Sequence, residues 1–99
     1  METKDLQDLC VEVCDKLDIK YNVDRDPQLS FTQLMEEVGE LAKAVNMPRL
    51  RNTELDQDNL NEEFADVLIQ LAALAKVHNV DLEDVTKKKI IELKEKHNV

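Results

Sequence analysis

The chain has 99 residues, and its 22 acidic and 13 basic side chains leave a formal net charge of −9. This length predicts a single domain over residues 1–99, and the negative charge excludes a general affinity for nucleic acid or for anionic membranes. Only one glycine and two prolines occur, and together with abundant Ala, Leu, Glu and Lys this composition favours an all-α protein.

A first helix is predicted over about residues 3–18, where apolar residues recur at three- and four-residue spacing. Cys10 falls within this apolar stripe and Cys14 follows one turn later, so we expect a buried free thiol. A zinc site would need two more ligands, and His78 and His97 lack a suitable spacing. The charged N-terminal segment and the lack of a long apolar run predict a cytoplasmic protein without a signal peptide.

Residues 19–29 interrupt the apolar pattern with polar residues and a proline, which predicts a loop. Ser30 then begins a segment typical of a capping box at a helix start. A regular apolar stripe predicts a second helix over about residues 31–46, and Pro48 is expected to end it.

The third predicted helix, over about residues 59–78, differs from the others in kind. Between Val67 and Val77 only two residues are polar, so apolar side chains point in nearly every direction around the axis. A helix of this kind is buried on several sides. Since a chain this short buries little surface alone, we expect a homodimer or homotetramer that completes a helical bundle. Asn79 and Asp81 predict a turn and the N-cap of a fourth helix over about residues 82–97.

Two acidic clusters of the same shape lie on the second and third predicted helices. They read Glu36-Glu37-x-x-Glu40 and Glu62-Glu63-x-x-Asp66. At about 100° per residue, Glu37 borders the buried stripe and Glu36 points furthest from it. Asp66 shares its direction with apolar residues of the third helix, where an ionised carboxylate is unfavourable unless it is paired or bound to a metal.

Facing clusters of carboxylates without matching cations would repel each other, so we infer a bound divalent metal ion. Oxygen ligands favour Mg²⁺, with Mn²⁺ as a second possibility. Neither cluster has the histidine spacing of a di-iron bundle, and the segment from Asp56 to Asp58 lacks the turn glycine of a calcium loop. A solvated surface is the alternative for each acid, above all for Glu36 and Glu62.

Lys89 is the candidate cation for an anionic ligand. It lies between Val85 and Leu93 in the apolar stripe of the fourth helix, so its ammonium group either extends to solvent or meets an anion such as a phosphate. Lys87 and Lys88 point elsewhere around the helix.

Together these elements resemble the MazG-like family of all-α nucleoside triphosphate pyrophosphohydrolases. The resemblance covers about residues 30–90: the segments MEEVGEL (35–41) and EEFADV (62–67), followed by a basic helix. It implies a dimer or a dimer of dimers that hydrolyses an NTP or dNTP to the monophosphate and pyrophosphate, in nucleotide-pool house-cleaning. A tryptophan often found at the entry to the family's second helix is absent.

The resemblance also implies roles for individual residues. The Mg²⁺ ligands correspond to Glu37, Glu40, Glu63 and Asp66, and Lys89 corresponds to a basic residue that contacts phosphates. The family often has a second basic residue about one turn later, but position 93 is a leucine here, with Lys94 beside it.

The mechanism we hypothesise uses a carboxylate as general base for the attacking water, either Glu37 or Glu36. Tyr21 and Arg25, in the loop before the second helix, could stack on or hydrogen-bond to the nucleotide base, or be ordinary loop residues. The alternative function is a non-catalytic dimeric helical adaptor, or a nucleotide-binding regulator with a degenerate site.

Overall fold

The computed structural model describes residues 3–99, and in that part of the chain it contains four α-helices and no strand. They are α1 (Thr3–Lys20), α2 (Pro27–Arg51), α3 (Gln57–Val77) and α4 (Leu82–His97). The prediction of an all-α protein with about four helices is therefore confirmed. None of the described helices combines the length and apolar composition needed to span a bilayer.

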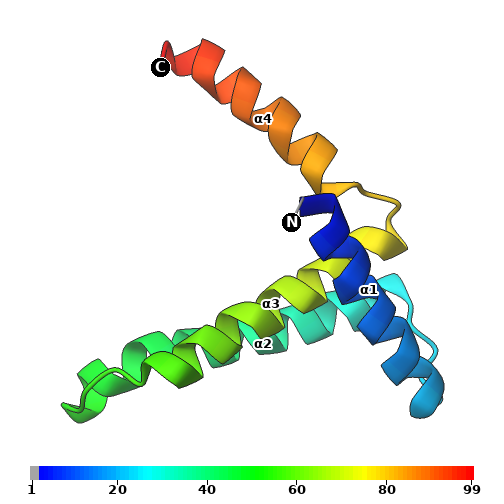
Figure 1. Ribbon diagram of the computed structural model, residues 1–99. Coiled ribbons are helices and arrows are strands. Elements are labelled where there is room, and N and C mark those ends of the chain that lie inside the picture. Colours follow the sequence, from blue (N-terminus) through cyan, green and yellow to red (C-terminus); the bar gives the residue numbers. More distant parts are fainter. Residues whose placement is uncertain (1–2) are drawn as a thin grey trace.

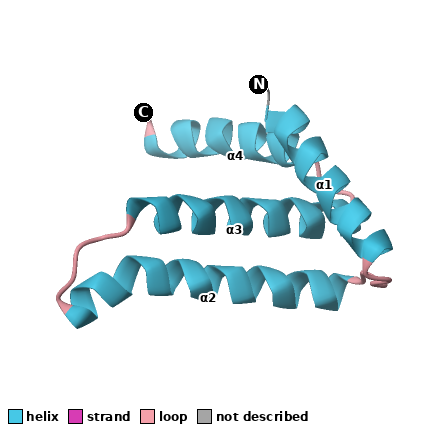
Figure 2. Cartoon of the chain, turned by 60° about the horizontal axis from the view of Figure 1, so that its bottom comes forward, coloured by secondary structure: helices cyan, strands magenta, loops and turns pink. Residues whose placement is uncertain are grey.

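The two longest helices, α2 and α3, form an antiparallel pair (Figure 1). They lie side by side along most of their length, and α1 crosses the end of the pair near the C-terminus of α3 (Figure 2). The last helix, α4, contacts α1 and extends away from α2 and α3 (Figure 1). The radius of gyration is 16.2 Å, larger than the roughly 13 Å of a compact domain of about 100 residues, so one chain alone is an open structure.

The start of α2 differs from the prediction. The helix begins at Pro27 and not near residue 31, because Asp26 is its N-cap and accepts a hydrogen bond from Leu29 N at 2.8 Å. Proline suits the first helical position, since its fixed φ matches the helix and its missing N–H is not needed there. Ser30 therefore is not a cap. It is fully buried inside the first turn, and its Oγ accepts a hydrogen bond from Arg25 Nη1 at 3.2 Å.

The prediction that Pro48 ends α2 is also wrong. The helix continues to Arg51 and closes at Asn52, whose φ of 53° is left-handed. The N–H groups of Asn52 and Thr53 both donate to the Pro48 carbonyl, which satisfies the end of the helix. Proline is compatible with helical φ, and its missing N–H removes only the one bond that would have reached the Ala44 carbonyl.

The start of α4 is as predicted. Asn79 adopts a left-handed φ of 56°, and the Asp81 carboxylate accepts a hydrogen bond from Asp84 N at 3.2 Å. Gln7 of α1 holds this turn, because its side-chain amide donates to Val80 O and its oxygen accepts from Leu82 N, both at 2.9 Å. This double contact is one polar link between α1 and the base of α4.

The core consists mainly of small side chains. Its buried apolar residues are Cys10, Cys14, Leu34, Ala44, Ala72, Ala73 and Ala75. Both thiols are free, which confirms the prediction of a buried free cysteine. Alanines on α3 allow the backbones of α1 and α2 to approach it closely.

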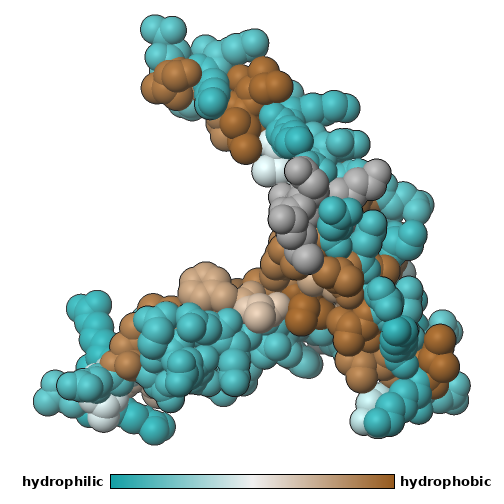
Figure 3. All heavy atoms as spheres, in the orientation of Figure 1, coloured by the Kyte–Doolittle hydropathy of each residue, from teal (hydrophilic) through white to brown (hydrophobic). Residues whose placement is uncertain are grey.

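A large apolar surface stays exposed in the single chain. On α3 it includes Phe64, Leu68 and Leu71, although the sequence predicts a helix buried on several sides. On α4 no residue is buried, and its apolar side chains lie open along the helix (Figure 3). Burial of α3 on several sides is thus not reached within one chain, and oligomerisation stays a prediction.

Candidate metal site

Three carboxylates from the two acidic clusters meet between α2 and α3. Glu37 of α2 and Glu63 and Asp66 of α3 each place one oxygen within 4.8 Å of the others. Glu37 and Glu63 are half-buried, and Asp66 is exposed. The i,i+3 spacing puts Glu63 and Asp66 on one face of α3, and the antiparallel pairing brings Glu37 opposite them. We call these three residues the carboxylate triad.

The surroundings of Asp66 differ from the prediction. Its direction around α3 is that of Ala73, which is 3% exposed, yet Asp66 itself faces solvent. The reason is that α1 covers only the C-terminal part of α3, where Cys14 and Ala73 line a common cavity. Two turns earlier α1 no longer covers α3 (Figure 1), and Asp66 is exposed there although its carboxylate lies close to Glu37 of α2.

Burial and neighbouring negative charges raise the proton affinity of two carboxylates of the triad, Glu37 and Glu63. The pKa of Glu37 is raised above its ordinary value, first by burial and then by the negative charges of Asp66, Glu63 and Glu40. The pKa of Glu63 is raised by burial and then by the charges of Asp66 and Glu40. Without a cation the triad is therefore electrostatically unfavourable at neutral pH.

The residues of the triad fit a hard divalent cation. One oxygen of Glu63, Oε2, is buried and has no hydrogen-bond partner, which is a costly state for a carboxylate. A cation bound between the helices would satisfy this oxygen and remove the repulsion. An all-oxygen set of this kind suits Mg²⁺ or Mn²⁺ better than zinc or copper.

The other predicted acids lie around the triad. Glu40 is exposed, and its Oε1 lies 3.3 Å from Lys43 Nζ, but its charge still acts on Glu37 and Glu63. Glu36 is exposed and contributes to the raised pKa of its neighbour Glu37. Their predicted roles, Glu40 as a metal ligand and Glu36 as a general base, stay predictions.

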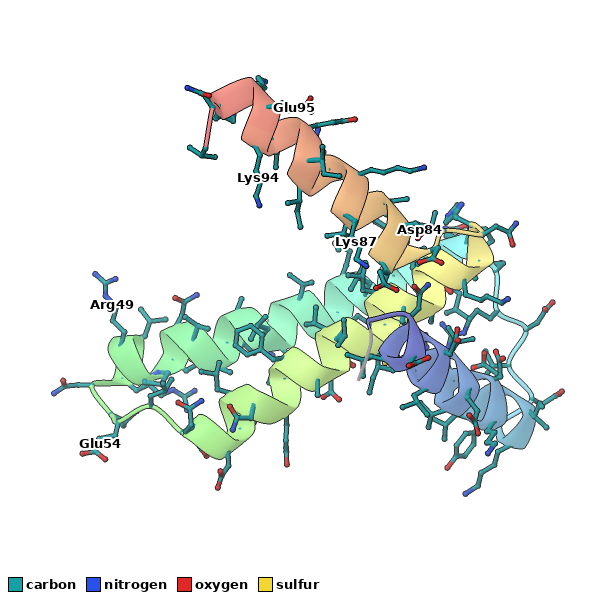
Figure 4. All side chains as sticks on the ribbon, turned by 45° about the horizontal axis from the view of Figure 1, so that its top comes forward. Arg49, Glu54, Asp84, Lys87, Lys94 and Glu95 are labelled. Atoms are coloured by element: carbon teal, nitrogen blue, oxygen red, sulfur yellow. The ribbon has the colours of Figure 1, made fainter. Side chains whose placement is uncertain are left out.

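The structure does not bring Lys89 to the triad within one chain. Lys89 lies on α4, which extends away from α2 and α3, and its Nζ is 3.6 Å from Glu92 Oε2 on the same helix. Both side chains are well exposed. In the view of Figure 4, Lys94 points from α4 toward the side of α2, and Glu95 points away from it. Contact of Lys89 with phosphate stays a prediction.

Tyr21 and Arg25 occupy different environments. Tyr21 is exposed at the end of α1, with Lys20 Nζ 5.3 Å from the centre of its ring. The Arg25 guanidinium is held from two sides: Nε and Nη2 donate to Asp18 at 2.7 and 3.0 Å, and Nη1 donates to Gln33 Oε1 at 2.7 Å. Arg25 thus links the end of α1 to α2. Base recognition by either residue stays a prediction.

Sequence reasoning missed two polar features near the triad. Gln70 Oε1 is buried without a hydrogen-bond partner, one turn from Asp66 on α3. A cavity also lies beside the triad, between the C-terminal part of α2 and the start of α3. The only sequence signal for the buried Gln70 oxygen is that this glutamine stands alone in the apolar run of the third helix. Nothing in the sequence pattern indicates the cavity.

A comparison with protein families matches residues 25–98 to the MazG nucleotide pyrophosphohydrolase domain. The match contains α2, α3 and α4 and both acidic clusters, and it leaves out α1. Neither a search of curated proteins nor one of solved structures gives a significant match.

Proposed function

The chain belongs to the MazG nucleotide pyrophosphohydrolase domain family, and we propose that it is a magnesium-dependent hydrolase of nucleoside triphosphates. The products would be the nucleoside monophosphate and pyrophosphate, from an NTP or a dNTP. The observation that carries the proposal is the carboxylate triad, in which two helices converge on a shared set of oxygens and one oxygen of Glu63 lacks a partner.

In the proposed reaction, the oxygen of a water molecule bonds to the α-phosphorus of the triphosphate. The bond between this phosphorus and the oxygen that bridges to the β-phosphorus breaks, and its electron pair leaves with pyrophosphate. Bound Mg²⁺ would neutralise the phosphates and lower the pKa of the attacking water. Glu36 is exposed beside the triad and would accept the proton of the water, and Glu37 is the second candidate for this role.

The exposed apolar surface supports a homodimer or homotetramer as the working form. Phe64, Leu68 and Leu71 of α3 stay exposed beside the other described helices, and no residue of α4 is buried. Burial of such surface is the main driving force of association. Light scattering should give a mass of at least two chains, and a monomer mass would contradict this part of the proposal.

Pyrophosphate release tests the enzymatic part. The protein is incubated with a panel of NTPs and dNTPs with and without Mg²⁺, and we expect release that depends on the metal. Asp66→Asn and Glu40→Gln should abolish it, whereas Glu95→Gln on the far end of α4 should not. Nucleotide binding without release from any substrate would instead favour a regulator with a degenerate site. Full activity of Asp66→Asn would show that the site is elsewhere.

A further inference from the structure

Helix α1 carries an exposed apolar stripe in addition to its buried face. Leu9, Val13 and Leu17 follow one another at four-residue spacing and are between 41% and 50% exposed, whereas Cys10 and Cys14 are buried. We call the three exposed residues the α1 stripe. Since α1 precedes residues 25–98, which match the family, membership of the family does not account for the stripe.

An open hollow lies along the stripe. Its volume is about 280 Å³, and it is lined by Leu9, Glu12, Val13 and Lys16. Four residues at positions i, i+3, i+4 and i+7 of a helix form the hole that receives one side chain of a facing helix in knobs-into-holes packing. The stripe therefore offers a packing site for another helix, and Val13 is both part of the hole and a side chain that can fill one.

The charges along one edge of the stripe are complementary to themselves. Asp5 and Glu12 lie on the N-terminal half of this edge, and Lys16 and Lys20 lie on its C-terminal half. At about 100° per residue, these four side chains fall within a sector of about 80°. Glu12 Oε1 accepts a hydrogen bond from Lys16 Nζ at 2.9 Å, but both side chains are well exposed, and such a pair contributes little. An edge that is acidic at one end and basic at the other attracts an antiparallel copy of itself.

We propose that a second copy of the chain docks on the α1 stripe, with the two α1 helices antiparallel about a two-fold axis near Val13. A two-fold contact uses the same surface of both copies, so this surface must be complementary to itself. Val13 of each copy then fills the hollow of the other, and Leu9 of one copy lies opposite Leu17 of the second copy.

The charges agree with this arrangement. At 1.5 Å per residue, Glu12 lies within about 4 Å, measured along the axis, of Lys16 of the second copy, which is within the reach of a lysine side chain. Asp5 lies at the level of Lys20 of the second copy. The stripe is small beside a standard interface, which buries about 1,600 Å². We therefore expect a weak contact, and a mass that depends on protein concentration. Together with association through α3 and α4, it gives a dimer of dimers.

Reversal of single charges tests the antiparallel pairing. Glu12→Lys makes the edge basic around the two-fold axis, and Lys16→Glu makes it acidic, so each variant places like charges opposite each other. In analytical ultracentrifugation each should raise the dissociation constant of this contact about tenfold, because two symmetry-related pairs change at once. An equimolar mixture of the two variants should restore the affinity, since a basic edge then faces an acidic one. The ion pair within one helix cannot explain such a restoration, because it is broken in both variants.

Val13→Glu tests the apolar part of the contact. It puts a carboxylate into the hollow and should raise the dissociation constant about a hundredfold, which halves the mass at a suitable concentration. The matched control is Ile19→Glu, because Ile19 is an apolar residue of the same helix, is 82% exposed and points about 120° away from Val13. Its mass should equal that of the unaltered protein. Leu9→Glu repeats the measurement if circular dichroism shows that Val13→Glu has lost its helices.

Each outcome decides the question. An unchanged mass of folded Val13→Glu overturns the inference and leaves the stripe to a different protein, and a monomer at every concentration overturns it as well. A mixture of the charge variants that associates no more tightly than either variant alone overturns the antiparallel pairing. The inference does not rest on the proposed activity: if no triphosphate is hydrolysed but mixing restores the affinity, the activity fails and the inference stands.

Discussion

Replacement of Glu37 by glutamine should stabilise the protein without metal and destabilise it with metal. Glu37 faces Glu63 and Asp66 with oxygens within 4.8 Å. At this distance two unit charges repel each other by roughly 0.9 kcal/mol even with the dielectric constant of water. Glutamine keeps the shape of the side chain and removes the charge. After discounting for solvent and salt, we expect Glu37→Gln to gain about 1 kcal/mol in the metal-free protein at pH 7.

With Mg²⁺ bound, the unaltered protein should be more stable than Glu37→Gln. A cation present at about 100 times its dissociation constant stabilises the unaltered protein by roughly 2.7 kcal/mol, and Glu37→Gln loses one of the three ligands that make this binding possible. The measurement is thermal unfolding with EDTA and with Mg²⁺. A gain of about 1 kcal/mol corresponds to roughly 4–8 °C in a domain of this size.

The control is Glu95→Gln, which removes a carboxylate from an exposed position on α4, away from the triad (Figure 4). Its melting temperature should differ little from that of the unaltered protein in either condition. If Glu37→Gln melted lower than the unaltered protein in EDTA, the repulsion argument would be refuted. An undiminished response of Glu37→Gln to Mg²⁺ would show that the cation binds elsewhere.

Three further predictions concern the pH response and the packing. The pKa values of Glu37 and Glu63 are raised in the folded state, so the folded protein binds protons more tightly than the unfolded one, and metal-free stability should fall as the pH rises from about 4 through these pKa values. Saturating Mg²⁺ should remove this decline in urea titrations, and a metal-free stability that rises over the same window would contradict the assignment. Arg25→Ala should cost about 3 kcal/mol in urea unfolding, because it leaves the Asp18 carboxylate, 15% exposed, without its partner; a loss below about 1 kcal/mol would mean that this ion pair is not structural. Ala72→Leu should cost about 1–3 kcal/mol, because the site is fully buried, and an unchanged unfolding midpoint would show that α3 can move away from its neighbours.

Several features of this protein could be predicted from the sequence because they depend on local spacing. Apolar periodicity indicates four helices, and the boundaries of α1 and α4 lie close to the prediction. The N-cap at Asp81 follows from residue type and position alone. The spacing within each acidic cluster likewise places Glu63 and Asp66 on one face of α3, and Glu37 at the edge of the buried stripe of α2.

The remaining features depend on contacts between residues far apart in the chain. Which carboxylates meet is decided by the register of α2 against α3, which arises from packing around buried residues such as Leu34 and Ala72 and leaves Glu40 beside the triad. Ser30 is buried under Arg25, although its local sequence is typical of a cap, because α1 folds back onto this turn. The direction of α4 separates Lys89 from the triad and leaves Lys43 and Arg51 as the cations beside it. Local periodicity specifies the face of a helix, whereas only tertiary packing specifies what that face meets.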